Sequence, residues 1–236
     1  MAAPILRTKT AVEFSYPKDD DHTYRIPPGV ELVAGRSYCI FGVSGSGKST
    51  LLTLLASLRT YNRGEIDYVF DDSRSFTVTA SNWRQQAGPR LWANIGFAFQ
   101  RPELIKTLTV EQNLELTRSA SRDDVEQLFN IEKEWAEIRG SRIWKVSGGQ
   151  TQRLGLLRAF GRGQRLVFLD EPTNNLDRDN RDAAAHFVHS QQNDRAIVVV
   201  SHDQEFLRLI DVDTTFRIEE RVDANGHKTR ILSTTA

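Results

Sequence analysis

Eight residues near the start of the chain have the composition of a phosphate-binding turn. Residues 42–49 read Gly-Val-Ser-Gly-Ser-Gly-Lys-Ser, which fits the pattern G-x-x-x-x-G-K-[ST]. Glycines let the backbone curl so that successive N–H groups point at phosphate oxygens, and the N-terminus of a following helix favours anions. An apolar strand before the turn and an apolar helix after it complete this context. The pattern predicts a nucleotide site in which Lys48 reaches the β- and γ-phosphates and the Ser49 hydroxyl ligates Mg²⁺.

A second group of reactive side chains follows a short apolar run far along the chain. Residues 166–171 read Leu-Val-Phe-Leu-Asp-Glu, which predicts a buried strand with two carboxylates at its C-terminal end. Sites in parallel α/β sheets lie at that end of the strands. We expect Asp170 to hold Mg²⁺, directly or through water, and Glu171 to orient or deprotonate the attacking water.

Further motifs narrow the kind of nucleotide site. Residues 146–150 read Val-Ser-Gly-Gly-Gln, residues 171–177 read Glu-Pro-Thr-Asn-Asn-Leu-Asp, His202 follows an apolar run, and Gln100 closes the run 95–99. In this order, and with the two groups above, they resemble the signature, D-loop, switch histidine and Q-loop of ABC (ATP-binding cassette) ATPases. The resemblance extends from Phe14 to about Glu219. Val146 stands where leucine is usual, and Trp144 where many members have a small residue or proline.

The resemblance assigns roles to individual residues. It implies catalysis by Glu171, His202 and Gln100, with Mg²⁺ held by Ser49, Gln100 and Asp170. It implies that two copies face each other in opposite orientation with each ATP between them. The residues that it assigns to ATP are Gly42, Ser44, Gly45, Ser46, Gly47, Lys48, Ser49 and Thr50 of one copy, Ser147, Gly148, Gly149 and Gln150 of the other, and Asp177, which would reach across the interface.

ABC ATPases usually stack an aromatic ring on adenine from a loop well before the phosphate loop. Tyr16 matches that position best, and Tyr24 is the alternative. A tyrosine that packs on a strand pair would have the same local sequence, so the residues alone leave this open.

The hydrophobic pattern predicts an α/β fold with a mainly parallel sheet, an N-terminal antiparallel β part and an inserted helical lobe. We expect a single domain over 1–236, with residues 1–99 and 147–236 as a RecA-like core and 100–146 as a helical subdomain. Helices are expected over about 48–58, from 109 to about 139, over 148–161 and over 181–192. Strands are expected over 37–41, 95–99, 166–169 and 196–200, and Asn225-Gly226 predicts a hairpin.

Composition limits where the protein works. Its 31 basic and 31 acidic residues balance, so a global attraction to nucleic acid is not expected. The single cysteine, Cys39, lies in an apolar run and is expected to be a core residue. No apolar run approaches the roughly 20 residues that cross a bilayer. We expect a cytoplasmic protein without direct membrane insertion, peripheral on the inner face of the cell membrane through a partner.

Two functional classes fit a cassette of this kind. The first is the ATPase subunit of a membrane transporter or related machine that docks on a separate permease subunit. Residues 94–100 and 175–177 look similar to the lipoprotein-release, macrolide-export and cell-division group. The alternative is a soluble ABC ATPase that acts on ribosomes or nucleic acid, because translation factors also favour the sequence at 171–177. Those factors carry two cassettes in one chain, which favours the transporter class.

Overall fold

The computed structural model describes residues 3–17, 21–117 and 121–234. The strands in these ranges are β1 (Pro4–Phe14), β2 (His22–Ile26), β3 (Glu31–Val33), β4 (Arg36–Phe41), β5 (Arg63–Asp71), β6 (Arg74–Thr79), β7 (Ile95–Ala98), β8 (Leu166–Asp170), β9 (Ala196–Val200), β10 (Thr214–Val222) and β11 (Lys228–Thr234). The helices are α1 (Lys48–Leu55), α2 (Trp83–Gln86), α3 (Pro89–Trp92), α4 (Val110–Glu115), α5 (Arg122–Leu128), α6 (Ala136–Ile138), α7 (Gly148–Ala159), α8 (Arg178–Ser190) and α9 (Gln204–Leu209). A π-helical turn lies at Ile131–Trp135 and a 3-10 turn at Ile143–Lys145.

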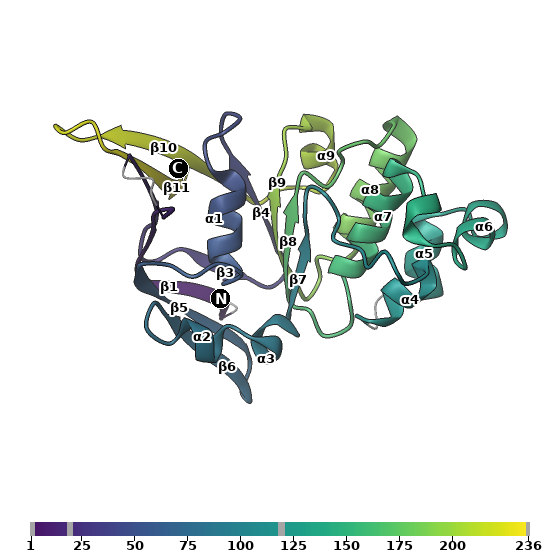
Figure 1. The fold of residues 1–236 in the computed structure, drawn as a ribbon, viewed down its shortest axis with the longest axis horizontal. Helices are drawn as coiled ribbons and strands as arrows, with labels where there is room; N and C mark the ends of the chain where they lie inside the picture. The colour runs from purple at the N-terminus through teal and green to yellow at the C-terminus, as the bar shows by residue number, and fades with distance from the viewer. Residues whose placement is uncertain (1–2, 18–20, 118–120, 235–236) are drawn as a thin grey trace.

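The described strands form one mixed sheet in the order β6-β5-β1-β2-β11-β10-β4-β9-β8-β7, with β3 beside β1. Strands β6, β5, β1 and β2 pair antiparallel, whereas β10, β4, β9, β8 and β7 pair parallel. Figure 1 shows the β-rich part on one side of α1 and the group α4–α8 on the other side of the central strands. The predicted α/β class, with an antiparallel N-terminal part and a helical lobe, is confirmed.

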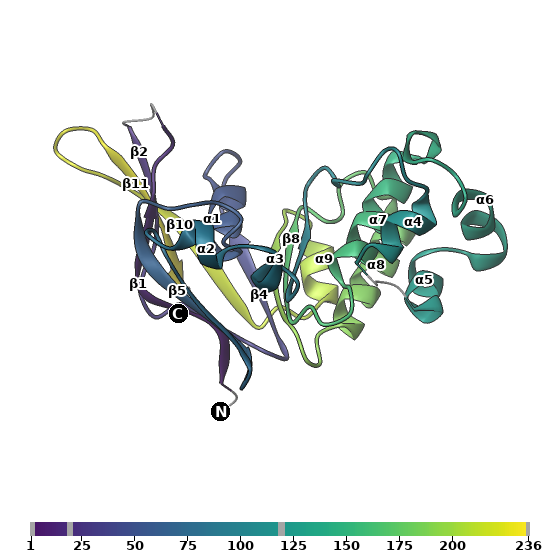
Figure 2. The ribbon, with the colours of Figure 1, turned by 60° about the horizontal axis from the view of Figure 1, so that its bottom comes forward.

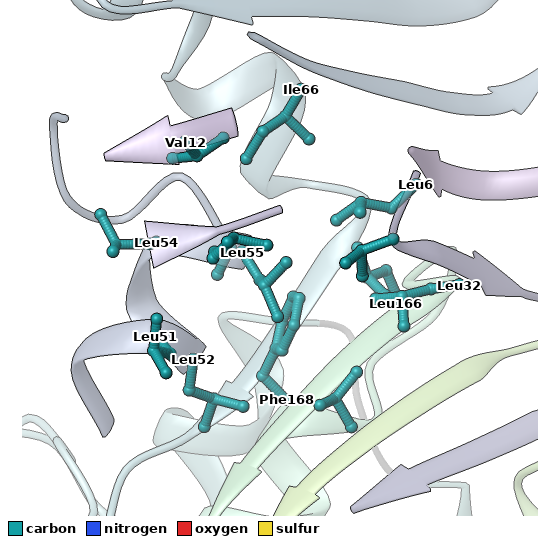
Figure 3. Close-up of a cluster of buried hydrophobic side chains, with 14 of the residues drawn as sticks. Leu6, Val12, Leu32, Leu51, Leu52, Leu54, Leu55, Ile66, Leu166 and Phe168 are labelled. Carbon is teal, nitrogen blue, oxygen red and sulfur yellow. The ribbon is translucent and has the colours of Figure 1, made fainter. Parts of the chain in front are cut away.

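The central strands are buried on both faces, which explains their unbroken apolar sequences. In β8, Leu166 and Phe168 belong to the core on the α1 side, and Val167 and Leu169 to the core beneath α7 and α8. This alternation follows from the period of two in a strand. Figure 3 shows Phe168 among the leucines of α1. Both faces of β8 are therefore packed, which leaves its C-terminal end as the place where polar side chains emerge.

The predicted helical stretch 109–139 is interrupted. It begins as expected, since the Thr109 side chain accepts from the Gln112 N–H in a capping box. A second capping box at Ser121 starts α5, and the extended backbone of Phe129 ends it. The helix predicted over 48–58 ends at Leu55, where Ser57 takes a left-handed conformation with φ 47°.

Several other expectations agree with the structure. The β10–β11 hairpin turns at Asn225-Gly226, and Cys39 is buried in β4, where burial raises the pKa of its thiol to about 11.

Helix α8 begins at Arg178, earlier than the expected start at residue 181, because the Asp177 side chain caps it. Among the residues that the structure describes, no helix combines the length and the apolar character needed to span a bilayer.

Candidate active site

The phosphate loop joins the end of β4 to the start of α1. Gly45 and Gly47 take left-handed φ values of 77° and 93°. Two features exclude a side chain at Gly47. One is its left-handed φ, and the other is Tyr24, whose Cε1 would lie 2.1 Å from an added Cβ. The Lys48 ammonium lies inside the curl, where it donates to the carbonyl oxygens of Gly42 (2.8 Å) and Val43 (3.1 Å). The loop therefore wraps around the Lys48 ammonium at the N-terminus of α1.

A cavity opens beside this loop and collects most of the residues that the motifs predicted. Strand β8 contributes its carboxyl end, and the segments after β7 and β9 contribute Gln100 and His202. The residues that line the cavity are Tyr24, Ser44, Gly45, Gly47, Lys48, Ser49, Thr50, Gln100, Asp170, Glu171, Asn174, Val200 and His202. Gly42 and Ser46 belong to the same loop without lining the cavity.

Asp170 has the environment of a metal ligand. It is 6% exposed, and its Oδ1 has no hydrogen-bond partner among the described residues. Burial raises the pKa of Asp170, while a hydrogen bond from Ser49 and the charge of Lys48 oppose that rise. A buried carboxylate oxygen without a partner needs a cation, and the hydroxyl of Ser49 and the amide of Gln100 add hard oxygen donors. The residues present therefore fit Mg²⁺.

Glu171 is held in a strained conformation that aims its carboxylate at His202. Its φ of 48° is left-handed, which costs of order 1–3 kcal/mol for a residue other than glycine. Three backbone contacts hold it: its N–H donates to Val200 (2.8 Å), and its carbonyl accepts from the Asn174 N–H (3.2 Å) and from Gln152 Nε2 (3.3 Å). Its Oε2 accepts from the His202 N–H (3.3 Å), and its Oε1 lies 3.5 Å from His202 Nε2. Burial raises the pKa of this carboxyl.

The two candidate adenine tyrosines occupy different positions. Tyr16 does not line the cavity, but its hydroxyl lies 2.9 Å from that of Thr50, which does. The Arg59 guanidinium lies over the Tyr16 ring at 4.8 Å. Tyr24 lines the cavity, yet it is only 6% exposed and its ring supports Gly47. The ring of Tyr24 is therefore already packed against the phosphate loop.

The signature segment lies outside this cavity. Ser147 caps α7 by accepting from the Gln150 N–H, and the Gln150 side chain completes the capping box. Ser147 and Gly148 are exposed, and Gly149 packs near the Asn175 carbonyl. The Asp177 side chain accepts from the Asn180 N–H as the cap of α8. In the part of the chain that the structure describes, the N-terminus of α7 therefore does not line this cavity.

Three residues at the site were missed from sequence. Gln152 follows the signature and reaches the Glu171 carbonyl, and Asn174 lies between two motif residues. Both could have been suspected from their place in the motifs. Arg230 contacts the phosphate loop from β11. Nothing in its local sequence signals that contact.

Comparison with known proteins decides the family. The model of the family described as "ABC transporter" matches residues 28–174. The chain belongs to the ABC transporter ATP-binding family. Members are ATPases, so the predicted ATP-hydrolysing activity is confirmed at the level of the family.

The curated relatives with similar sequences include ATP-binding proteins of transport systems. An uncharacterized ABC transporter ATP-binding protein of Escherichia coli, YbbA, is 35% identical over 194 residues, covering 78% of this chain and 82% of that protein. The lipoprotein-releasing system ATP-binding protein LolD of Buchnera aphidicola is 31% identical and covers 86% of this chain and 90% of LolD. The macrolide export ATP-binding/permease protein MacB of Shigella flexneri is 30% identical over 86% of this chain, but the match spans 31% of MacB.

Solved structures support the fold. The dimeric structure of MJ0796, a bacterial ABC transporter cassette, has a TM-score of 0.69 at 24% identity and covers 90% of this chain and 93% of that one. The archaeal ribosome recycling factor aABCE1 has a TM-score of 0.66 at 19% identity, and the match spans 38% of its chain. At these identities the two likenesses show the fold.

Lys48→Ala should raise the Kd for ATP by roughly tenfold or more, since hydrogen bonds to charged groups contribute about 1.5–3 kcal/mol each. The fold should survive, which circular dichroism can check. Equilibrium binding of a fluorescent ATP analogue measures the effect, with Lys106→Ala, an exposed lysine outside the cavity, as the control. Equal affinity in the two variants would contradict the assignment of the phosphate loop.

Proposed function

We propose that this chain binds and hydrolyses Mg²⁺-ATP as a head-to-tail dimer and powers a membrane transporter as its ATPase subunit. The proposal rests on one observation: within one chain, the two helix N-termini suited to bind phosphate, that of α1 and that of α7, lie apart. The phosphate loop and both carboxylates line one cavity, whereas the capped, exposed N-terminus of α7 lies outside it. A second copy in opposite orientation would bring its α7 to that cavity.

Binding begins with the triphosphate at the N-terminus of α1. Backbone N–H groups of residues 44–50 and the Lys48 ammonium surround the phosphates, and the helix end favours their charge. Mg²⁺, held by Ser49, Asp170 and Gln100, would neutralise phosphate charge when bound. Asp170 keeps an unpartnered oxygen for that purpose. The chain itself therefore supplies the phosphate donors and the oxygen ligands that this substrate needs.

Hydrolysis requires a water in line with the γ-phosphate. Glu171 acts as the general base that accepts its proton, and the raised pKa of this buried carboxyl brings it nearer to neutral pH, where a base is most effective. His202 lies against Glu171 and is half exposed, so it can turn toward the γ-phosphate. Gln100 lines the same cavity and orients the water.

The second copy closes the site. Its Ser147, Gly148, Gly149 and Gln150 offer backbone N–H groups at the α7 end to the γ-phosphate, a helix terminus prepared by the capping box. Asp177 lies in the segment next to that end and reaches the opposite site on association. Hydrolysis removes contacts made by both copies, so ATP favours the closed dimer and ADP the open one. A lone copy binds ATP and hydrolyses it poorly.

Adenine stacks near Tyr16 in this scheme. The contact of the Tyr16 hydroxyl with Thr50 at the start of α1 supports a position of this ring near the base end of a nucleotide whose phosphates lie in the loop. Tyr24 is almost fully buried against Gly47 and serves as a support of the loop. Base–aromatic stacking is worth about 1–3 kcal/mol on alanine substitution.

Glu171→Gln should keep ATP affinity and stop hydrolysis, because the amide keeps the shape of the carboxyl and accepts no proton. With Mg²⁺-ATP the variant should elute as a dimer on size exclusion, while phosphate release falls by about a hundredfold or more, where the usual range for a lost general base begins. Glu219→Gln, on the exposed β10, is the matched control. Phosphate release by Glu171→Gln at the control rate would remove Glu171 from the mechanism.

The membrane partner docks where the chain leaves Gln100. A second cavity there is lined by aromatic and apolar side chains of β7 and the segment that follows it, together with the charged residues Glu103 and Arg158. Leu104 is buried in the helical core, whereas Ile105 is 41% exposed. An apolar centre with a charged rim is the usual make-up of a docking site. Because the same segment carries Gln100, a permease seated here would sense the nucleotide state.

Reversing the charge of Glu103 tests this docking site. Glu103 is exposed, so Glu103→Arg should leave the fold and basal ATP hydrolysis unchanged, yet remove the chain from detergent-solubilised membrane complexes. Co-purification from membranes measures the loss, and Glu219→Arg is the control. Retention of Glu103→Arg at the control level would contradict this docking site, and co-purification of the wild-type chain with ribosomes would contradict the transporter role.

A further inference from the structure

An arginine of the C-terminal hairpin contacts the phosphate loop from its outer side. Arg230 lies in β11, and its Nη1 donates to the Gly45 carbonyl oxygen at 3.0 Å. The two residues are separated by 185 positions in the chain. Strand β11 lies beside β2 (Figure 2), and Arg230 pairs in register with Tyr24, whose ring supports the loop at Gly47. Neither the motifs nor the comparisons assign a role to this arginine.

Two contacts besides the one to the loop fix the Arg230 guanidinium. Its Nε donates to Glu220 Oε2 at 3.2 Å, and the two residues are direct cross-strand partners in the hairpin. Its Nη1 also donates to the Tyr24 hydroxyl at 3.1 Å, and Tyr24 is its register partner in β2. The Arg230 side chain is 17% exposed. The hydrogen bond from Arg230 lowers the pKa of Glu220, which keeps that carboxylate charged. The guanidinium is therefore held in place before it meets the loop.

The contact determines how one peptide group of the loop is turned. A peptide is planar, so its C=O and N–H point in opposite directions. Both ends of the Gly45–Ser46 peptide are hydrogen-bonded: its carbonyl oxygen accepts from Arg230, and its N–H, that of Ser46, donates to the Val43 carbonyl oxygen at 3.2 Å. Gly45 has a left-handed φ and no side chain, so without Arg230 only the bond to Val43 would hold this peptide in its orientation.

Tyr24 supports the loop at a second point. Its ring fills the space that a side chain at Gly47 would need, and its hydroxyl accepts from Arg230. The Arg230 guanidinium carbon lies 5.6 Å from the centre of the same ring. Arg230 and Tyr24 thus form one backing for the outer side of the loop, with Glu220 behind it.

We propose that Arg230 is a positioning residue for ATP binding, which holds the Gly45–Ser46 peptide, and with it the phosphate loop, in the conformation that receives the triphosphate. Glu220 orients Arg230 for this task. The inference rests on the ATP site proposed above and adds to it a part supplied by the C-terminal hairpin. Arg230 touches the loop and not the reacting atoms, so it acts on nucleotide binding and leaves the hydrolytic step to Glu171.

Substitution of Arg230 separates positioning from simple packing. Arg230→Ala should raise both the Kd and the KM for ATP about tenfold, the usual scale for loss of a hydrogen bond to a charged group, with kcat little changed. Arg230→Lys should recover part of the affinity, because an ammonium can still donate to the Gly45 carbonyl. Glu220→Gln should weaken binding in the same direction and by less. Arg221→Ala, an exposed arginine of the same hairpin, is the matched control.

Three measurements read the outcome: equilibrium binding of ATP, steady-state hydrolysis and thermal unfolding without nucleotide. The proposal is upheld if KM and Kd rise in Arg230→Ala while the melting temperature stays at that of Arg221→Ala. It is overturned if Arg230→Ala binds ATP as tightly as the wild-type chain. It is also overturned if Arg230→Ala loses affinity and melting temperature together and Arg230→Lys restores neither. Lys48→Ala, measured in parallel, keeps the two proposals apart. If Lys48→Ala loses ATP binding and Arg230→Ala does not, the proposed ATP site is supported and the role of Arg230 is contradicted.

Discussion

A backbone that turns its N–H groups toward an anion turns its carbonyl oxygens away from it, and those oxygens need donors of their own. In this chain Lys48 donates to the Gly42 and Val43 carbonyls, and Arg230 donates to that of Gly45. The rest of the site is placed relative to the loop that these bonds hold. Strand β4 leads into it, α1 leaves it, and β9 and β8, which follow β4 in the sheet, bring His202 and the two carboxylates to its side.

The proposed general base, Glu171, is connected to the helix α7 of the signature segment within the same chain. Gln152 of α7 is buried and donates to the Glu171 carbonyl, so a movement of α7 acts directly on the residue with strained backbone. At the other side of α7, Glu134 accepts from both Gln150 and Arg153. Glu134 lies in the π-helical turn of the helical lobe. Helix α7 thus links the lobe proposed to meet a membrane partner to the carboxylate proposed to activate water.

Much of the site could be predicted from sequence because its parts are short motifs with local structural causes. The phosphate loop, the carboxylates after β8 and the cap at Ser147 each depend on residues within a few positions of one another. The contact of Arg230 could not be predicted, because it depends on the register of β11 with β2, in which Arg230 pairs with Tyr24, 206 positions away. The break in the helical lobe was missed for a different reason. The caps at Thr109 and Ser121 start separate helices within one apolar pattern.

The central claim is that each active site uses the phosphate loop of one copy and the α7 end of the other, and a mixing experiment tests it most directly. Lys48→Ala and Ser147→Arg chains are each defective at both sites as homodimers. In a mixed dimer the two lesions fall in one site, and the other site has an intact Lys48 and an intact Ser147. The account predicts ATP hydrolysis on mixing above that of either variant alone. Absence of recovery, with mixed dimers demonstrated by native mass spectrometry, would contradict it.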